Sequence, residues 1–206
     1  MSQHLAVRWT VAPVTAPRPL INCNRCGTVK AYRCSSKFRV NANGKRIDVW
    51  LIYRCVDCDN SWNFGILERC NRRDIGPTLL ASLESNDPML ARRHAFDVVA
   101  LRNRVGRVEE FSDVAVHKHR LGDEGATVLE IRLALEAPTS LRLDRLLAGE
   151  LGISRSRLQA LDEKGLLVVV PEGARALRKS TRDGTTILID LAGEADHEAI
   201  ISAASG

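Results

Sequence analysis

Apolar and polar residues alternate with a strand-like period around Phe38, and Ile47–Tyr53 predicts a second strand, in which Val49–Tyr53 is an apolar run of a length typical of a buried strand. Between them, Asn43-Gly44 is a strong signal for a hairpin turn. Ser61–Leu67 indicates another strand. We therefore expect a β-hairpin followed by a third strand in this part of the chain.

From Pro77 the spacing of apolar residues becomes helical. One short helix should end before Asp87-Pro88, which reads as an N-cap and a first-turn proline. A second helix is expected over Met89–Arg104. Val114–His119 and Thr127–Leu135 then predict two strands around a turn at Gly122–Gly125.

Two further helices and two strands are expected in the C-terminal part. The first helix carries an apolar stripe and ends at Gly152, and the second begins at the N-cap Ser154 and ends at Gly165. The stripe consists of Leu143, Leu146, Leu147 and Leu151, and the second helix carries Leu158 and Leu161. Leu166–Val170 and Thr186–Leu191 predict strands, and the acidic tail after them predicts a frayed end or a brief helix at Glu194–Ala203.

Composition places these elements in an ordinary globular protein, since 45% of the residues are hydrophobic and 27% are charged. Disordered, collagen-like and coiled-coil chains are thereby excluded. The chain contains no apolar stretch long enough for a bilayer and no export signal at its start, so we expect a cytoplasmic protein without a membrane partner. Residues 1–76 carry 13 Lys/Arg against 5 Asp/Glu, which favours an anionic partner for that segment.

The cysteines add a candidate chemistry. Cys23 and Cys26 form one Cys-x-x-Cys turn, and Cys55 and Cys58 form another beyond the expected hairpin. Two such turns supply the four thiolates of a tetrahedral Zn²⁺ site, and with no position left for water the site should be closed and structural. A disulfide is disfavoured without an export signal, and a thioredoxin-like motif is disfavoured because neither turn opens a helix.

The other two cysteines and two histidines are not expected to bind a metal ion. Cys34 and Cys70 lack partners at this spacing and are interpreted as small buried hydrophobes, with redox sensing as the alternative. His117 and His119 share one face of an expected strand, which favours an exposed strand face over a second metal site.

These patterns predict an α+β chain in several small domains. We expect a zinc-ribbon-like β domain over residues 1–76 and a helical segment with a β-hairpin over residues 77–138. An αβ module should follow over residues 139–191, with an acidic tail over residues 192–206.

The 139–191 segment resembles a known family. Arg142-Leu143-Asp144, Ser154-Arg155-Ser156 and Arg178-Lys179-Ser180, with Leu147, Gly165 and Gly184, are similar to the RNA-binding domain named after small-subunit ribosomal protein S-four. The resemblance implies two helices packed on a small sheet, with a basic helix face against structured RNA. The RNA contacts that it implies are Arg142, Arg145, Arg155, Arg157 and Lys179. Val170-Pro171-Glu172-Gly173 and Ser180 depart from the family's usual hairpin and its usual proline.

A second resemblance is carried by residues 38–46, 48–55 and 61–63. They are similar to a bacterial family known only as a domain of unknown function. This resemblance supports the domain boundaries and implies no activity.

Together these observations predict a non-enzymatic, zinc-stabilised RNA-binding protein associated with the ribosome or with structured RNA. Lys37, Arg39, Lys45 and Arg46 of the ribbon would add phosphate contacts. Trp50, Trp62 and Tyr53 would stack on bases if exposed, although a small ribbon needs its large side chains for its core.

The alternative is a protein-interaction or regulatory scaffold whose S-four-like module no longer binds RNA. It would be favoured if Arg142, Arg155 and Arg157 were paired with carboxylates. DNA remains open as a third partner. An enzyme is disfavoured because the chain carries no phosphate-binding loop, nucleophile motif or open metal site.

Overall fold

The computed structural model describes residues 4–121 and 127–206, and it contains both helices and strands, as an α+β chain requires. The chain divides into two compact units. Unit 1 combines Met1–Thr15 with Ser112–Gly206, and unit 2 is Ala16–Phe111. No helix of the described residues is long and apolar enough to cross a membrane.

Unit 1 is built on a five-stranded sheet with the strand order β7-β1-β8-β10-β9. β1 runs parallel to β8, and the other neighbouring strands are antiparallel. The strands are β1 (His4–Pro13), β7 (Val114–Arg120), β8 (Val128–Leu135), β9 (Leu167–Val170) and β10 (Thr186–Asp190).

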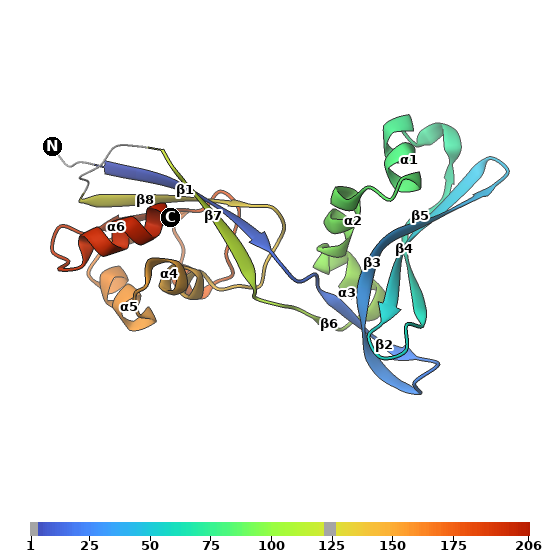
Figure 1. Ribbon diagram of the computed structural model, residues 1–206, viewed down its shortest axis with the longest axis horizontal. Helices are drawn as coiled ribbons and strands as arrows, with labels where there is room; N and C mark the ends of the chain where they lie inside the picture. Colours follow the sequence, from blue (N-terminus) through green and yellow to red (C-terminus); the bar gives the residue numbers. More distant parts are fainter. Residues whose placement is uncertain (1–3, 122–126) are drawn as a thin grey trace. The chain divides into compact units, whose positions relative to one another are not determined.

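Three helices cover one face of this sheet (Figure 1). They are α4 (Leu143–Leu151), α5 (Arg155–Glu163) and α6 (His197–Ser205), with a short 3₁₀ turn, η2 (Ala176–Arg178), beside them. Alternate β1 residues, among them Val7 and Trp9, are fully buried against these helices, as are Ile131 of β8 and Leu147 of α4. The sheet therefore has the one-sided burial expected of alternating strands.

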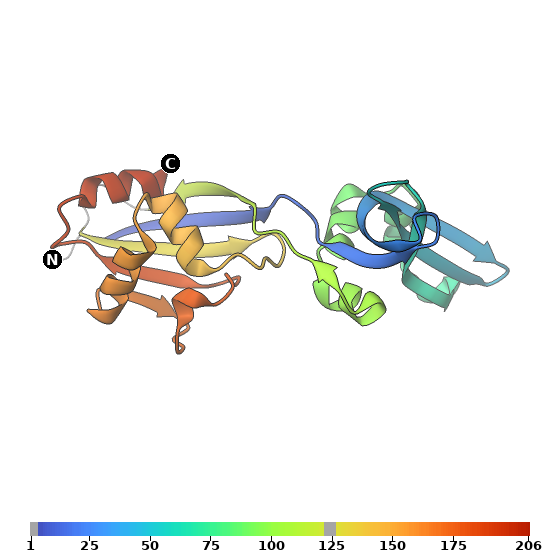
Figure 2. The same cartoon turned by 90° about the horizontal axis from the view of Figure 1, so that it is seen from below.

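The expected hairpin of Val114–His119 with Thr127–Leu135 is wrong in its pairing. Both strands form, as β7 and β8, but β1 lies between them and pairs with each (Figure 2). The expected turn at Gly122–Gly125 lies outside the described residues. Because β1 comes from the first residues of the chain, the expected domains over residues 1–76 and 77–138 differ from the two observed units.

The acidic tail was expected to be either a frayed end or a brief helix, and the structure shows the helix, α6. Within α6, Ile200 and Ala204 are buried in the core of unit 1. The segment after Leu191 is therefore an integral part of that unit.

Unit 2 is built on an antiparallel sheet with the strand order β5-β4-β3-β2-β6. The expected hairpin is present as β3 and β4, with Asn43 paired to Arg46 around the turn. The strands are β2 (Arg18–Cys23), β3 (Thr28–Asn43), β4 (Arg46–Cys55), β5 (Ser61–Asn71) and β6 (Val108–Glu109), and the 3₁₀ turn η1 (Arg72–Asp74) follows β5.

Three short helices pack on one face of this sheet: α1 (Pro77–Glu84), α2 (Pro88–Ala95) and α3 (Val98–Val105). The single helix expected over Met89–Arg104 is wrong, because the chain breaks at Phe96-Asp97. The Asp97 side chain accepts a hydrogen bond from the backbone N–H of Ala100 and so caps a new helix. Asp87 caps α2 in the same way, as expected.

Candidate functional site

The two Cys-x-x-Cys turns have the same backbone construction. In the first, the N–H groups of Cys26 and Gly27 both donate to the carbonyl of Cys23. In the second, the N–H of Asp59 donates to the carbonyl of Cys55. Gly27 and Asp59 occupy equivalent positions, each four residues after the first cysteine, and both adopt positive φ (71° and 56°). This left-handed residue closes each turn and directs its two sulfurs the same way.

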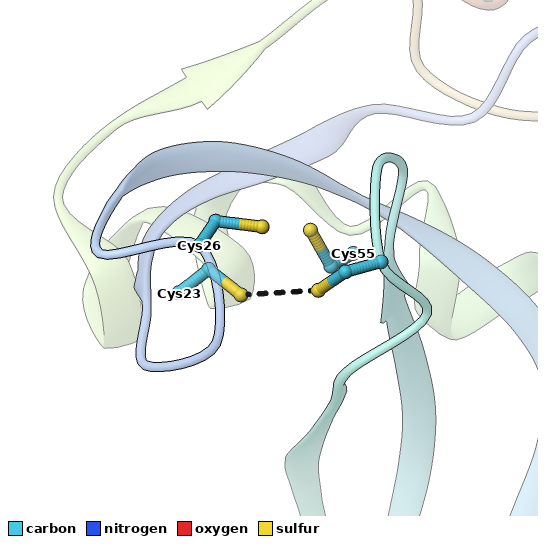
Figure 3. Close-up of side chains that lie close together, drawn as sticks. Cys23, Cys26 and Cys55 are labelled. Atoms are coloured by element: carbon cyan, nitrogen blue, oxygen red, sulfur yellow. Dashed lines mark hydrogen bonds between the residues drawn. The ribbon is translucent and has the colours of Figure 1, made fainter.

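The strands bring the four sulfurs together (Figure 3). Cys23 ends β2 and Cys55 ends β4, while Cys26 and Cys58 stand in the turns that follow. All four Sγ atoms lie within 4.8 Å of one another, and those of Cys23 and Cys58 are 3.5 Å apart. Four thiolates about 2.3 Å from one ion would be separated by about 3.8 Å, so this cluster could hold a metal ion.

Hydrogen bonds at the cluster favour a thiolate at Cys23. The Tyr32 hydroxyl donates to the Cys23 sulfur and lowers the pKa of that thiol to about 5. Burial, with the bond to Cys23, raises the pKa of Tyr32 to about 12. The Cys58 sulfur has the opposite effect on Cys26, whose pKa it raises to about 12. The residues around Cys23 thus favour the thiolate form that a metal ligand needs.

The other candidate ligands lie elsewhere. Cys34 on β3 is paired with Tyr53 and Cys70 on β5 with Ile47, both away from the cluster. Both side chains are half-buried, and burial raises the pKa of Cys34. His117 and His119 are exposed on β7. Within residues 4–121 and 127–206, the four cysteines are the one group of metal-binding side chains that comes together.

A second candidate site is a groove of about 580 Å³ in unit 1. It lies between the N-terminal end of α4, one side of α5 along its whole length and the turn η2, and its arginines are Arg142, Arg155, Arg175 and Arg178. Its carboxylates are Asp144, Asp162 and Glu163. The groove therefore presents four guanidinium groups against three carboxylates.

Asp144 organises two of the arginines. Its side chain is 9% exposed, and it accepts hydrogen bonds from Arg142 Nε (3.1 Å) and Nη2 (2.6 Å). It also accepts one from Arg155 Nε at 3.2 Å. A guanidinium group has five N–H donors, so each arginine keeps donors that Asp144 does not use. Asp144 thereby orients both groups at the groove.

The groove gathers Arg142 and Arg155 but not the other three expected contacts. Arg145 and Lys179 are exposed and do not line it. Arg157 is ion-paired with Glu194, and its Nη1 is 2.8 Å from the Asp196 carboxylate. The two carboxylates raise the pKa of Arg157, Asp196 more strongly. This pairing has a tertiary cause, because both partners belong to the segment that leads into α6.

Two arginines that line the groove were not among the expected contacts. Arg175 and Arg178 lie three residues apart and reach the groove through η2. Their i, i+3 spacing was the available signal. Arg175 has a positive φ of 57°. This backbone conformation is uncommon for arginine, so it could not be predicted from the residue type.

Comparison with known proteins identifies a family and no activity. Residues 40–172, more than half of the chain, match the family described as protein of unknown function (DUF1062). The match includes Cys55, Cys58 and the Asp144 groove arginines Arg142 and Arg155. No curated protein and no solved structure matches. The chain therefore belongs to the DUF1062 family.

Proposed function

We propose that this chain is a non-enzymatic RNA-binding protein whose unit 2 is held by one structural zinc ion. The ion would be bound by Cys23, Cys26, Cys55 and Cys58, because four thiolates form the closed tetrahedral set that Zn²⁺ takes in structural sites. Its contribution is folding energy for unit 2, and no chemical step depends on it.

RNA would bind at the arginine groove of unit 1. The observation that carries this proposal is the pair Arg142 and Arg155, held by a single buried carboxylate at the N-terminal ends of two helices. Helix N-termini favour anions, and guanidinium forks match phosphate oxygens. The S-four-like sequence pattern of residues 139–191 supports the same surface, since it implies a basic helix face against structured RNA.

The alternative, a protein-interaction or regulatory scaffold, is favoured by one specific observation. Arg142, Arg155 and Arg157 are all in ion pairs with carboxylates. The guanidinium group of Arg157 donates to two carboxylates, and Arg157 does not line the groove. For the other two, exposed fractions of 35% and 50% leave donors free, and we therefore favour RNA.

Equilibrium binding to structured ribosomal RNA and to duplex DNA across a salt series tests this proposal. The test variant is Arg175→Gln/Arg178→Gln. Neither arginine contacts Asp144, so substitution of both should leave the fold intact. The matched control is Arg182→Gln, an exposed arginine of unit 1 outside the groove.

We expect wild-type binding to prefer RNA and to weaken steeply with salt. The groove variant should bind several-fold more weakly, whereas the control should bind like wild type. Equal binding by the three proteins, or no binding by wild type, would reject the groove as an RNA site and favour the scaffold. Preference for duplex DNA would assign the groove to DNA.

A further inference from the structure

The three tryptophans of the chain have different environments. Trp9 is fully buried in unit 1. Trp62 is half-buried and packs edge-on against Tyr53 in the core of unit 2, with ring centroids 5.5 Å apart. Trp50 is also half-buried, but it does not belong to that core. It is therefore the tryptophan of unit 2 whose ring lies outside the packed core.

The alternation of β4 explains its position. Val49, Leu51 and Tyr53 are buried, and α1, α2 and α3 pack on the same face of the sheet. Trp50 and Ile52 point to the opposite face. We call the face of β3, β4 and β5 that carries Trp50 the outer face. In the described part of unit 2, all three helices pack on the other face.

A cation lies beside the indole. The guanidinium carbon of Arg39 is 5.9 Å from the centroid of the Trp50 ring, and the two residues are cross-strand partners on β3 and β4. On the other side, the cross-strand partner of Trp50 on β5 is Gly65, and the Glu68 carboxylate, ion-paired with Arg104 at 2.7 Å, fills the space that a Cβ at Gly65 would take. Arg39 is exposed, so it can contact the indole and a ligand at the same time.

Further along the outer face, the side chains are polar or basic. Arg54 follows Trp50 on the same face of β4, about 13 Å away at ordinary strand spacing. Arg33 is its cross-strand partner and is ion-paired with Asp59 at 2.7 Å. Asn63, the partner of Ile52 on β5, is exposed.

Carboxylates are present but are engaged by other groups. Asp48 shares this face, and its side chain accepts a hydrogen bond from the backbone N–H of Arg69 at 2.7 Å. Asp59 binds Arg33. The basic side chains Arg39 and Arg54 thus lie on the same face as the half-buried Trp50 ring, which gives this part of the face the charge expected of a surface for a polyanion.

We propose that the outer face binds an unpaired nucleic-acid strand, with one base stacked on Trp50 and neighbouring phosphates contacted by Arg39 and Arg54. Stacking on an accessible aromatic ring edge or face is possible with any base, and cations beside the ring can contact the phosphates of the strand. The proposal rests on the proposed RNA-binding function, but it assigns a different ligand form to a different surface: single strands here, structured RNA at the arginine groove.

The test measures fluorescence anisotropy of short labelled oligouridylate and oligothymidylate with purified protein. The variants are Trp50→Ala and Trp50→Phe, and the matched control is Ile52→Ala, which removes an apolar side chain from the same face of the same strand. Circular dichroism and zinc content confirm that each variant is folded.

We expect Trp50→Ala to weaken binding about tenfold or more, and Trp50→Phe to retain most of the affinity because phenylalanine also stacks. Ile52→Ala should change binding less than twofold. The tighter of the two oligonucleotides identifies the natural strand as RNA or DNA. The proposal is overturned if wild type binds neither oligonucleotide, or if Trp50→Ala and Ile52→Ala have equal effects.

A cross-test separates this proposal from the groove. Trp50→Ala should keep wild-type affinity for structured RNA, and Arg175→Gln/Arg178→Gln should keep wild-type affinity for the single strand. If the groove variant loses structured RNA while Trp50→Ala loses nothing, the outer face is rejected and the proposed function stands. If single strands bind through Trp50 while structured RNA does not bind, the groove is rejected and the outer face stands.

Discussion

Trp9 donates its indole N–H to the backbone carbonyl of Ala204, 2.8 Å away and 195 residues later in the chain. The same indole ring lies 5.2 Å from the ammonium group of Lys118. Lys118 in turn donates to the carbonyl of Ala203 at 2.7 Å. Strands β1 and β7 thus hold the last turn of α6, whose final carbonyls have no partner within the helix.

Trp9→Phe should destabilise unit 1. The smaller ring loses the buried hydrogen bond to Ala204 and leaves its carbonyl unsatisfied, with part of the packing volume also lost. We expect a loss of about 1–3 kcal/mol in the free energy of unfolding. Urea unfolding followed by circular dichroism measures it. Trp50→Phe is the control, since Trp50 lies outside both cores, and an equal loss there would contradict the assignment.

Removal of one cysteine of the cluster should remove the metal. Wild-type protein is expected to contain about one zinc ion per chain, and Cys55→Ser should contain almost none. Because metal binding contributes to folding, Cys55→Ser or chelation of wild type should selectively unfold unit 2. Elemental analysis and hydrogen exchange provide the two measurements. Cys70→Ser is the matched control, and a similar loss of zinc there would refute the four-cysteine site.

Zinc retention should depend on pH through Tyr32. The metal needs thiolates, and protons compete with it as the pH falls. Since the Tyr32 hydroxyl lowers the pKa of Cys23, Tyr32→Phe should raise that pKa and shift zinc release to higher pH. A chromogenic chelator follows the release. Tyr53→Phe is the control because its buried hydroxyl has no hydrogen-bond partner among the described residues, and it should leave the midpoint unchanged.

Unit 2 should also lose stability in mild acid through His94. Burial, aided by Arg93 and opposed by Asp97, lowers the pKa of His94, whose ring packs edge-on against Phe38. The unfolded chain therefore takes up this proton before the folded chain does. The resulting stability is present above the ordinary histidine pKa of about 6.5 and is lost as the pH falls below it.

His94→Gln should consequently lose less stability than wild type between about pH 7.5 and 5.5. Urea unfolding at several pH values measures the difference. The same substitution at the exposed His117 shows whether removal of any histidine has this effect. Parallel curves for wild type and His94→Gln would exclude this contribution.

Local features of this protein were predictable from its sequence because each depends on a few neighbouring residues. The Cys-x-x-Cys spacing predicted two matching turns, and the structure brings their sulfurs together. Asn43-Gly44 predicted the β3–β4 turn, and Ser154 predicted the cap of α5, where its side chain accepts from the Arg157 N–H at 3.1 Å. In each case the hydrogen bonds involved span only a few positions.

The groove and the outer face required the tertiary structure. The partners of Arg157, Glu194 and Asp196, are 37 and 39 positions away. The run Val49–Tyr53 is apolar on both faces of its strand, so its period could not show that Trp50 points outward while Tyr53 points inward. Burial on one face is decided by which helices pack there.

The sequence by itself determined which four cysteines come together and could bind a metal ion, most of the helices and strands, and the basic residues near the ends of α4 and α5. Only the tertiary structure decided that β1 separates β7 from β8, and that unit 1 joins both ends of the described chain. A strand's own residues specify that it is extended and which face is apolar. Its partner is chosen by burial shared with segments more than a hundred residues away, which no local pattern encodes.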